Sequence, residues 1–326
     1  MSDLDFTPSV PVKKGYKYLW VEKYRPDSIA KIVLPNSTSA LFKKFIEEKQ
    51  IPNLFFFSSA PGTGKTSTAR ALLNNCGYEY KYINTSLDNG IDVVRTQITR
   101  YASSFSFEDK PKAVILDEFD GASMAFQQAL RALIEEHEDR CRFIIVCNYK
   151  NMIIDPLKSR LQAVDFNYGS KKEKAELLPK FTKRLRMILN NESVKFNPET
   201  LDTFAESMYP DVRKMVNTLQ LFSKKNDVVT DDILDFCSVD DEFIDLITRF
   251  KYTAVKQYVV DKSYNYDDLY TLMFEQLIPK VDKRAIPELI FEIAEYADRS
   301  TRALNKEIQF CACVLKIIQI LSEYGE

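Results

Sequence analysis

The feature that most constrains the fold is an alternation of two apolar patterns between residues 54 and 167. Short strand-like runs, among them LFFFS, YKYIN, AVILD, RFIIVCN and AVDFN, alternate with longer segments whose apolar residues recur at helical spacing, such as TSTARALLNNC and MAFQQALRALIEEH. Strands separated by helices pair in parallel, and a parallel sheet needs helices on its faces. The sequence therefore predicts an α/β fold built on a parallel sheet.

The rest of the chain is predicted to be helical. From residue 168 to about Lys225 every apolar run fits helical spacing, and Pro198 and Pro210 suit the starts of helices. The helical periodicity continues beyond Asp227, and the final run, IQFCACVLKIIQIL, is apolar on most faces. Such a helix is either buried in its own chain or covered by another subunit, and the pattern fits both equally.

Composition excludes several classes of protein. The six cysteines include no C-x-x-C pair, which argues against a structural zinc site and for free thiols in a reducing compartment. The first residues lack the basic and apolar parts of a secretion signal, and no run approaches about 18 apolar residues. We therefore expect a cytoplasmic protein that does not span a membrane.

Charge is unevenly distributed along the chain. Residues 1–228 carry 34 Lys and Arg against 28 Asp and Glu, whereas residues 229–326 carry 11 against 19. The net charge of -2 is thus compatible with a positive face for nucleic acid in the first part. We interpret the lysine-rich stretch 171–186 and His137 as solvated surface.

A glycine-containing loop joins the first strand-like run to the helix after it. Its sequence is Ser59-Ala60-Pro61-Gly62-Thr63-Gly64-Lys65-Thr66-Ser67. Glycines permit the conformations in which backbone N–H groups converge on phosphates, and the helix start adds a favourable dipole. Lys65 can then reach the outer phosphates, and the Thr66 hydroxyl can ligate Mg²⁺. The pattern predicts a nucleotide-phosphate site, although Ser59 replaces the usual first glycine.

Polar residues follow the later strands, where ligands of parallel sheets bind. Asp117 suits the metal and Glu118 suits polarising the attacking water, although adjacent carboxylates can also be a solvated strand end. Asn148 can orient that water or simply form a turn. Arg160 could stabilise charge on a transferred phosphate, but its spacing alone favours a surface arginine.

These residues together resemble one family. The segments KYRP (23–26), PGTGKTS (61–67), NTS (84–86), GIDVVR (90–95), LDEFD (116–120) and QQALR (127–131), with Asn148 and Ser159-Arg160, resemble the clamp-loader ATPases of the AAA+ class. These include the small subunits of replication factor C and, more similar still, the large subunit of T4-type phage clamp loaders. The resemblance is dense over residues 20–167, moderate to Leu221, and limited to length and helical pattern beyond.

The resemblance implies a role for each matching residue. It places the nucleotide base among Tyr24, Arg25, Pro26, Ile32 and Val33, and ATP phosphates along residues 60–67. It makes Thr66 and Asp117 the Mg²⁺ ligands, Glu118 the base and Asn148 the first sensor. Arg160 becomes a finger donated to a neighbouring subunit's ATP site, and Arg213 a second sensor from the lid. Gln127 and Arg131 lie on a helix that links the DNA side to the Glu118 side.

The resemblance also implies an architecture and partners. We expect an N-terminal arm (1–18), an AAA+ ATPase core (19–167), a helical lid (168–228) and a helical collar (229–326) that oligomerises. Several copies and a smaller subunit would form an open ring that grips primer–template DNA and opens a sliding clamp. For the DNA backbone we favour Gly90, Ile91, Arg95 and the helix start at Ser123, because helix N-termini can hold phosphates without reading bases.

Three departures from the family pattern bear on activity. Ser59 replaces the first glycine of the loop, Leu161 a cysteine and Ala132 an arginine. The phage-type subunit that the chain resembles also tolerates a residue other than glycine at the first position, so we interpret the departures as features of the phage branch. Because Lys65, Glu118 and Arg160 are all present, we expect a subunit that hydrolyses ATP. The alternatives are an AAA+ helicase or branch-migration motor, which the KYRP segment and the Ser-Arg pair argue against, and a scaffold that binds ATP without hydrolysis.

Overall fold

The computed structural model describes residues 18–87, 90–106, 109–226, 228–237, 239–262 and 266–324. The chain divides into two compact units, Met1–Asp231 and Asp232–Glu326. Except for Tyr18, the expected N-terminal arm lies outside the described residues. The division of the first unit into an ATPase core and a lid stays a prediction.

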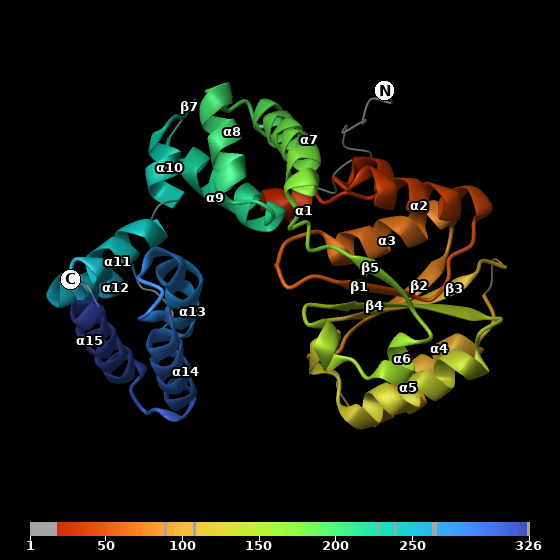
Figure 1. The fold of residues 1–326 in the computed structure, drawn as a ribbon. Helices are drawn as coiled ribbons and strands as arrows, with labels where there is room; N and C mark the ends of the chain where they lie inside the picture. Colours follow the sequence, from red (N-terminus) through yellow and green to blue (C-terminus); the bar gives the residue numbers. More distant parts are fainter. Residues whose placement is uncertain are drawn as a thin grey trace. The chain divides into compact units, whose positions relative to one another are not determined.

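A five-stranded parallel sheet forms the centre of the first unit. Its strands are β1 (Leu54–Phe57), β2 (Glu79–Asn84), β3 (Lys112–Asp117), β4 (Cys141–Cys147) and β5 (Gln162–Asp165). Their order is β2-β3-β4-β1-β5, and Leu54 of β1 pairs with Ile144 on one side and Gln162 on the other. The predicted α/β fold is confirmed, and β1, whose carboxyl end leads into the glycine-containing loop, lies between β4 and β5 inside the sheet (Figure 1).

Side chains alternate between the two faces of the sheet, so each face has its own core. Leu54 and Phe56 of β1 pack with α2 (Asn36–Glu48) and α3 (Lys65–Cys76), whereas Phe55 packs on the other side. That other side is covered by a π-helical segment, Val93–Ile98, and by α4 (Thr99–Ser103), α5 (Met124–Glu136) and α6 (Asp155–Lys158). Burial on both faces explains why the inner strands β1, β3 and β4 are almost uniformly apolar, whereas the edge strands β2 and β5 are more exposed and carry polar residues.

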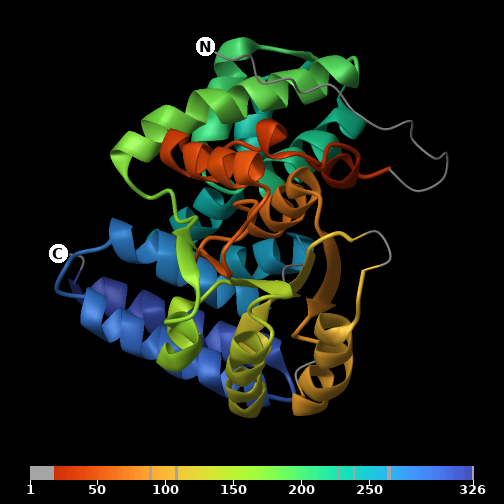
Figure 2. The same ribbon diagram turned by 90° about the vertical axis from the view of Figure 1, so that its right-hand side faces the viewer.

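Helices complete the first unit. A short helix, α1 (Trp20–Lys23), and a 3₁₀ turn, Ile29–Lys31, precede α2. Later come α7 (Lys171–Asn191), α8 (Pro198–Ser207) and α9 (Val212–Lys225). Helix α7 lies beside the start of α2, where the Asn36 N–H donates to Glu176 at 2.6 Å and Lys180 Nζ donates to the Leu34 carbonyl at 3.1 Å (Figures 1 and 2).

Local details of this region differ from the sequence-based expectation in two ways. Pro198 begins α8 as predicted, but α9 begins two residues after Pro210, because the Asp211 side chain accepts a hydrogen bond from the Lys214 N–H and caps the helix. The region predicted to be wholly helical also contains a two-residue parallel pairing between β6 (Lys195–Phe196) and β7 (Val228–Val229).

The second unit is helical. It contains α10 (Asp232–Cys237), α11 (Val239–Thr248), α12 (Tyr252–Lys262), α13 (Tyr266–Leu272), α14 (Ile286–Arg302) and α15 (Lys306–Tyr324), with a π-helical and a 3₁₀ segment at Met273–Leu277 and Ile278–Lys280. Phe310 and Ile317 of α15 are buried in its core, whereas Ile308 and Leu315 are exposed. The final helix is thus buried on one side and keeps apolar side chains uncovered on another. Within the described residues, no helix combines the length and apolarity needed to cross a membrane.

Candidate active site

The loop between β1 and α3 adopts a conformation that depends on glycine. Gly64 has φ +92° at the N-cap of α3, and Gly62 has φ +67°, a region that other residues rarely enter. Lys65, the first residue of α3, is buried, and its Nζ donates to the carbonyls of Ser58 at 3.2 Å and Ala60 at 3.3 Å. Burial lowers the pKa of Lys65, because it disfavours the charged ammonium. An anionic group beside Lys65 would stabilise that charge.

The same loop touches α9 directly. A Cβ atom on Gly62 would lie 1.7 Å from Oδ1 of Asp211, the residue that caps α9. Within the described structure, the buried Thr63 Oγ1 has no hydrogen-bond partner. An orphaned buried hydroxyl usually indicates a missing polar partner, and a phosphate oxygen would supply one. The loop therefore fits a nucleotide's phosphates.

Asp117 and Glu118 lie at the carboxyl end of β3. Asp117 is buried, and its two carboxylate oxygens accept separate hydrogen bonds, from the Tyr82 hydroxyl at 2.9 Å and from the Glu118 N–H at 3.0 Å. Burial, and then the charge of Asp117, raise the pKa of Tyr82 to about 12, so its hydroxyl keeps the proton that it donates. Glu118 is exposed beside it. A fixed buried oxygen ligand next to a freer carboxylate suits a division between metal binding and proton transfer.

Asn148 follows β4 at the same edge of the sheet. Its backbone N–H donates to Asp120 Oδ2 at 2.9 Å, and the Tyr149 N–H donates to Asp120 Oδ1 at 2.8 Å. Asp120 belongs to the turn that follows Glu118. The Asp120 carboxylate thus links the end of β4 to the turn that follows Glu118, the candidate general base.

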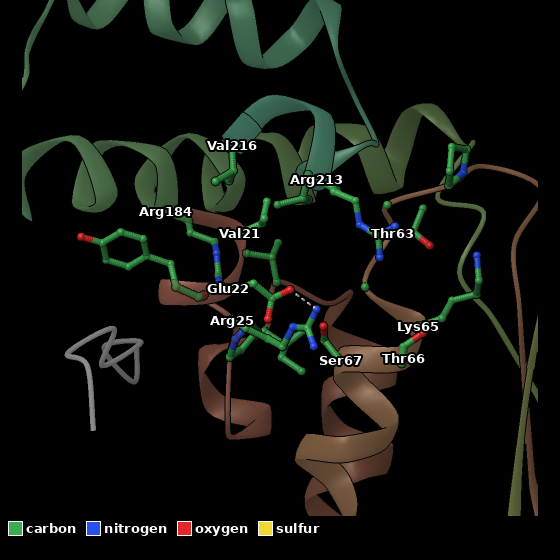
Figure 3. Close-up of a pocket in the computed structure, with 18 of the residues that line it drawn as sticks. Val21, Glu22, Arg25, Thr63, Lys65, Thr66, Ser67, Arg184, Arg213 and Val216 are labelled. Atoms are coloured by element: carbon green, nitrogen blue, oxygen red, sulfur yellow. Dashed lines mark hydrogen bonds and ion pairs between the residues drawn. The ribbon is translucent and has the colours of Figure 1, made fainter. Parts of the chain in front are cut away.

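A single cavity of about 520 Å³ collects most of these residues. It is lined by residues 61–67 of the loop, Asp117, Glu118 and Asn148, by the predicted base-binding residues Tyr24, Arg25, Pro26, Ile32 and Val33, and by Arg213. Arg213 reaches from α9 toward the loop that carries Thr63, while Arg25 forms an ion pair with Glu22 on the opposite wall (Figure 3). Of the predicted cofactor-binding residues, Ala60 does not line the cavity, but its carbonyl accepts from Lys65.

Sequence reasoning missed several lining residues, of which Arg184 and Trp20 make polar contacts that shape the cavity. Arg184 of α7 is buried and donates to the Tyr24 carbonyl at 2.7 Å and to the Lys31 carbonyl, so it holds the predicted nucleobase-binding segment at two points. Burial lowers the pKa of Arg184 to about 10. The interpretation of residues 171–186 as wholly solvated is therefore wrong at this position, because Arg184 shares the helical stripe of Phe181 and Leu185. Trp20 also lines the cavity, and its backbone N–H donates to the Gln220 side chain of α9 at 2.9 Å.

Other predicted residues lie outside the cavity. Arg160 is exposed, forms an ion pair with Glu135 of α5 and donates to the Ser159 hydroxyl at 3.0 Å. Gln127 is buried, and its side chain binds the backbone of the segment that follows β4. It donates to the Met152 carbonyl at 3.0 Å and accepts from the Ile154 N–H at 2.9 Å. Arg131, on the same helix, is exposed.

The residues predicted to contact DNA also lie away from the cavity. Gly90, Arg95 and Ser123 are exposed and Ile91 is half-buried. Ser123 caps α5, its hydroxyl accepting from the Phe126 N–H at 3.2 Å. Asp88 and Asn89, just before this segment, are outside the described residues. His137, predicted to be a surface residue, is instead buried at the end of α5, with Nε2 3.5 Å from the Ser103 hydroxyl.

Comparison with known proteins identifies relatives over most of the chain. Residues 55–167 match the model of the ATPase family associated with various cellular activities (AAA). The chain is 32% identical over 273 residues to the sliding-clamp-loader large subunit of Escherichia phage RB69, covering 81% of this chain and 85% of the relative. It is 31% identical over 329 residues to the replication factor C small subunit of Sulfolobus acidocaldarius, covering 94% and 98%.

A solved structure of a RuvB point mutant from Thermotoga maritima matches with a TM-score of 0.53 at 14% identity, covering 74% of this chain and 86% of that one. At this identity the likeness concerns the fold alone.

Proposed function

The chain belongs to the family of sliding-clamp-loader large subunits and replication factor C small subunits, and we propose that it hydrolyses ATP to open a sliding clamp and load it onto primer–template DNA. The observation that carries the proposal is the convergence of Lys65, Asp117, Glu118 and Asn148 on one cavity with the lid residue Arg213. The phosphate loop, the strand ends and a separate helix thus face one ligand-sized space.

Each lining group has a proposed task. The adenine base of ATP lies against Tyr24, Pro26, Ile32 and Val33. Arg184 holds the segment that carries these residues. The loop N–H groups and Lys65 bind the phosphates, and the Thr63 hydroxyl donates to a phosphate oxygen. Desolvation makes the Lys65 ammonium an effective partner for the charge on the outer phosphate.

The reaction itself is assigned to the strand ends. Thr66 and Asp117 would hold Mg²⁺, which when bound neutralises charge on the phosphates. Glu118 accepts a proton from the attacking water, and the Asn148 side chain orients that water. Arg213 places positive charge beside the phosphates from α9.

Assembly completes the site. Arg160 lies outside its own chain's cavity and is exposed, which supports a role in the ATP site of a neighbouring copy. The exposed apolar residues of α14 and α15, including Phe291 and Ile308, support oligomerisation through the second unit. Further copies and a smaller subunit would form an open ring around DNA.

Contact with DNA is proposed along the segment 90–95 and the start of α5 at Ser123. Helix α5 also carries Gln127, whose amide bonds to the backbone of residues 152 and 154, and Arg131. This helix is proposed to link the DNA side to the Glu118 side. Binding through phosphates should weaken as salt rises and depend little on base sequence. A strong preference for one base sequence at fixed duplex structure would contradict loading.

The test is steady-state ATP hydrolysis by the assembled complex, with and without primer–template DNA and the cognate clamp. Stimulation that needs a primer–template junction supports loading, and blunt duplex is the matched control for DNA. The Lys65→Ala variant sets the zero of the assay. Hydrolysis that neither junction nor clamp changes would contradict clamp loading while leaving the ATPase intact.

Two other functions make different predictions. A translocating motor would move along duplex DNA without a clamp, and the likeness to RuvB, at 14% identity, supports only a shared fold. A scaffold would bind ATP without turnover. Translocation and turnover measurements on the same preparation therefore separate all three.

A further inference from the structure

The backbone of Glu118 is held in an unusual conformation. Its φ is +53° and its ψ is +41°, in the left-handed region that residues with side chains rarely occupy. Backbone of this kind persists only where surrounding groups hold it, and such residues cluster at active sites. The groups that hold Glu118 therefore bear on where its carboxylate lies in the cavity.

Thr85 supplies some of these contacts from the end of β2, beside the bond from the Glu118 N–H to the Asp117 carboxylate. The regular pairing of β2 with β3 ends at Asn84 and Asp117. Thr85 is one residue further and fully buried, and its N–H donates to the Asp117 carbonyl at 2.9 Å. Its hydroxyl Oγ1 lies 2.9 Å from both the Asp117 and the Glu118 carbonyl oxygens. The hydroxyl thus extends the contact between the strands to the residue where β3 turns away.

The turn after Glu118 lies close against the end of β2. A Cβ atom on Gly121 would lie 3.2 Å from Ser86 Cα and 3.4 Å from the Thr85 carbonyl oxygen. The Gly121 N–H donates to the Glu118 carbonyl at 3.0 Å, and that carbonyl is the one that Thr85 also contacts. On its other side the turn is fixed by Asp120, which accepts from the backbone after β4. Thr85 is the side-chain donor at the Glu118 end of the turn.

We infer that Thr85 is a positioning residue for ATP hydrolysis: its hydroxyl holds the Glu118 backbone in the left-handed conformation that keeps the Glu118 carboxylate at the cavity. This inference rests on the proposed role of Glu118 as the base. A hydroxyl has one proton, so it donates to one carbonyl at a time, but each of the two carbonyls belongs to a peptide unit that flanks the Glu118 Cα, so either bond restrains the Glu118 backbone. Thr85 does not line the cavity, so we assign it an effect on geometry alone.

The main test is Thr85→Val, which keeps the side-chain shape and removes the hydroxyl, beside Thr85→Ser, which keeps the hydroxyl. Because a misplacement of about 1 Å can cost roughly 100-fold in rate, we expect Thr85→Val to lower kcat by about 10- to 100-fold. ATP affinity and KM should stay within about 2-fold, since the phosphate loop is untouched. Thr85→Ser should recover most of the rate. Thr85→Ala gives the same comparison if valine prevents folding.

A second background separates positioning from a general structural role. In Glu118→Gln, where the base is absent, adding Thr85→Val should change the residual rate by less than about 2-fold, because both changes act through one group. Thr200→Val is the matched control: Thr200 is buried, its hydroxyl donates to Asp231, and it lies outside the cavity. It should lower stability but leave kcat unchanged.

Three results would overturn the inference. They are an unchanged kcat in Thr85→Val, a fall in kcat matched by an equal loss of ATP affinity, and an equal fall in the Glu118→Gln background. If Glu118→Gln alone hydrolyses ATP at the normal rate, the assignment of the base fails and the role of Thr85 falls with it. An unchanged Thr85→Val beside an inactive Glu118→Gln would refute only the role of Thr85.

Discussion

Replacing Gly62 with alanine should destabilise the first unit through a contact with another part of the fold. Left-handed backbone costs a residue with a Cβ about 1–2 kcal/mol. The new Cβ would also lie 1.7 Å from Oδ1 of Asp211, so that carboxylate must move. Moving it breaks the cap at the start of α9, a 2.9 Å bond from the Lys214 N–H that is worth roughly 1 kcal/mol. The expected loss is therefore about 2–3 kcal/mol.

Gly77 offers a matched control. It has φ +74°, and nothing lies within 4 Å of the position its Cβ would take. Gly77→Ala therefore measures the backbone cost alone, about 1–2 kcal/mol. Urea unfolding can be followed by the fluorescence of Trp20, the single tryptophan, which is buried beside α9. Gly62→Ala should exceed Gly77→Ala by about 1 kcal/mol, the value of the lost cap.

The Asp211→Ala background tests the cause. With the carboxylate already removed, Gly62→Ala should cost no more than Gly77→Ala, because only the backbone term remains. An equal loss for Gly62→Ala and Gly77→Ala in the native background would refute the reasoning. So would an excess loss at Gly62 that persists without Asp211.

Three further changes test the proposed chemistry. Lys65→Ala should abolish hydrolysis, because it removes the main protein charge on the outer phosphates; undiminished turnover would contradict the phosphate-site assignment. Glu118→Gln should stall hydrolysis with ATP affinity preserved, since Asp117 remains for the metal, and a parallel collapse of affinity in a binding assay would contradict the division of roles. Arg160→Ala should lower the rate by roughly 10³- to 10⁵-fold with little change in ATP binding. Mixed rings of Arg160→Ala and Lys65→Ala subunits should partly regain hydrolysis, and mixed rings that form but stay inactive would exclude action between subunits.

The sheet and the phosphate loop could be predicted from the sequence because their signals are local. Each apolar run marks its strand to within about a residue, since burial on both faces leaves few polar side chains inside a strand. The loop is recognisable because Gly62 and Gly64 are both required by the backbone at those positions. The strand ends then brought Asp117, Glu118 and Asn148 to one edge of the sheet by topology alone.

The remaining contacts of the site could not be predicted because they join distant parts of the chain. Nothing near Gly62 in sequence indicates that Asp211 lies against it. Thr85 reads as an ordinary residue after a strand until β3 is placed beside it. Burial of Arg184 could have been predicted, because this arginine lies on the apolar stripe of its helix. The many lysines around it concealed that signal. His137 was wrongly predicted to be exposed because its neighbours in the sequence are acidic, but it is buried.

The bond between Trp20 and Gln220 sets an order for folding during protein synthesis. Helix α1 has four residues, too few for stability without a partner, and it packs on α9, 200 residues further along the chain. At about 5–20 residues per second, roughly 10–40 s separate the synthesis of the two. The sheet and its phosphate loop need only the chain as far as Asp165. In a nascent chain, the partner helix of α1 is therefore synthesised only after the whole of the sheet.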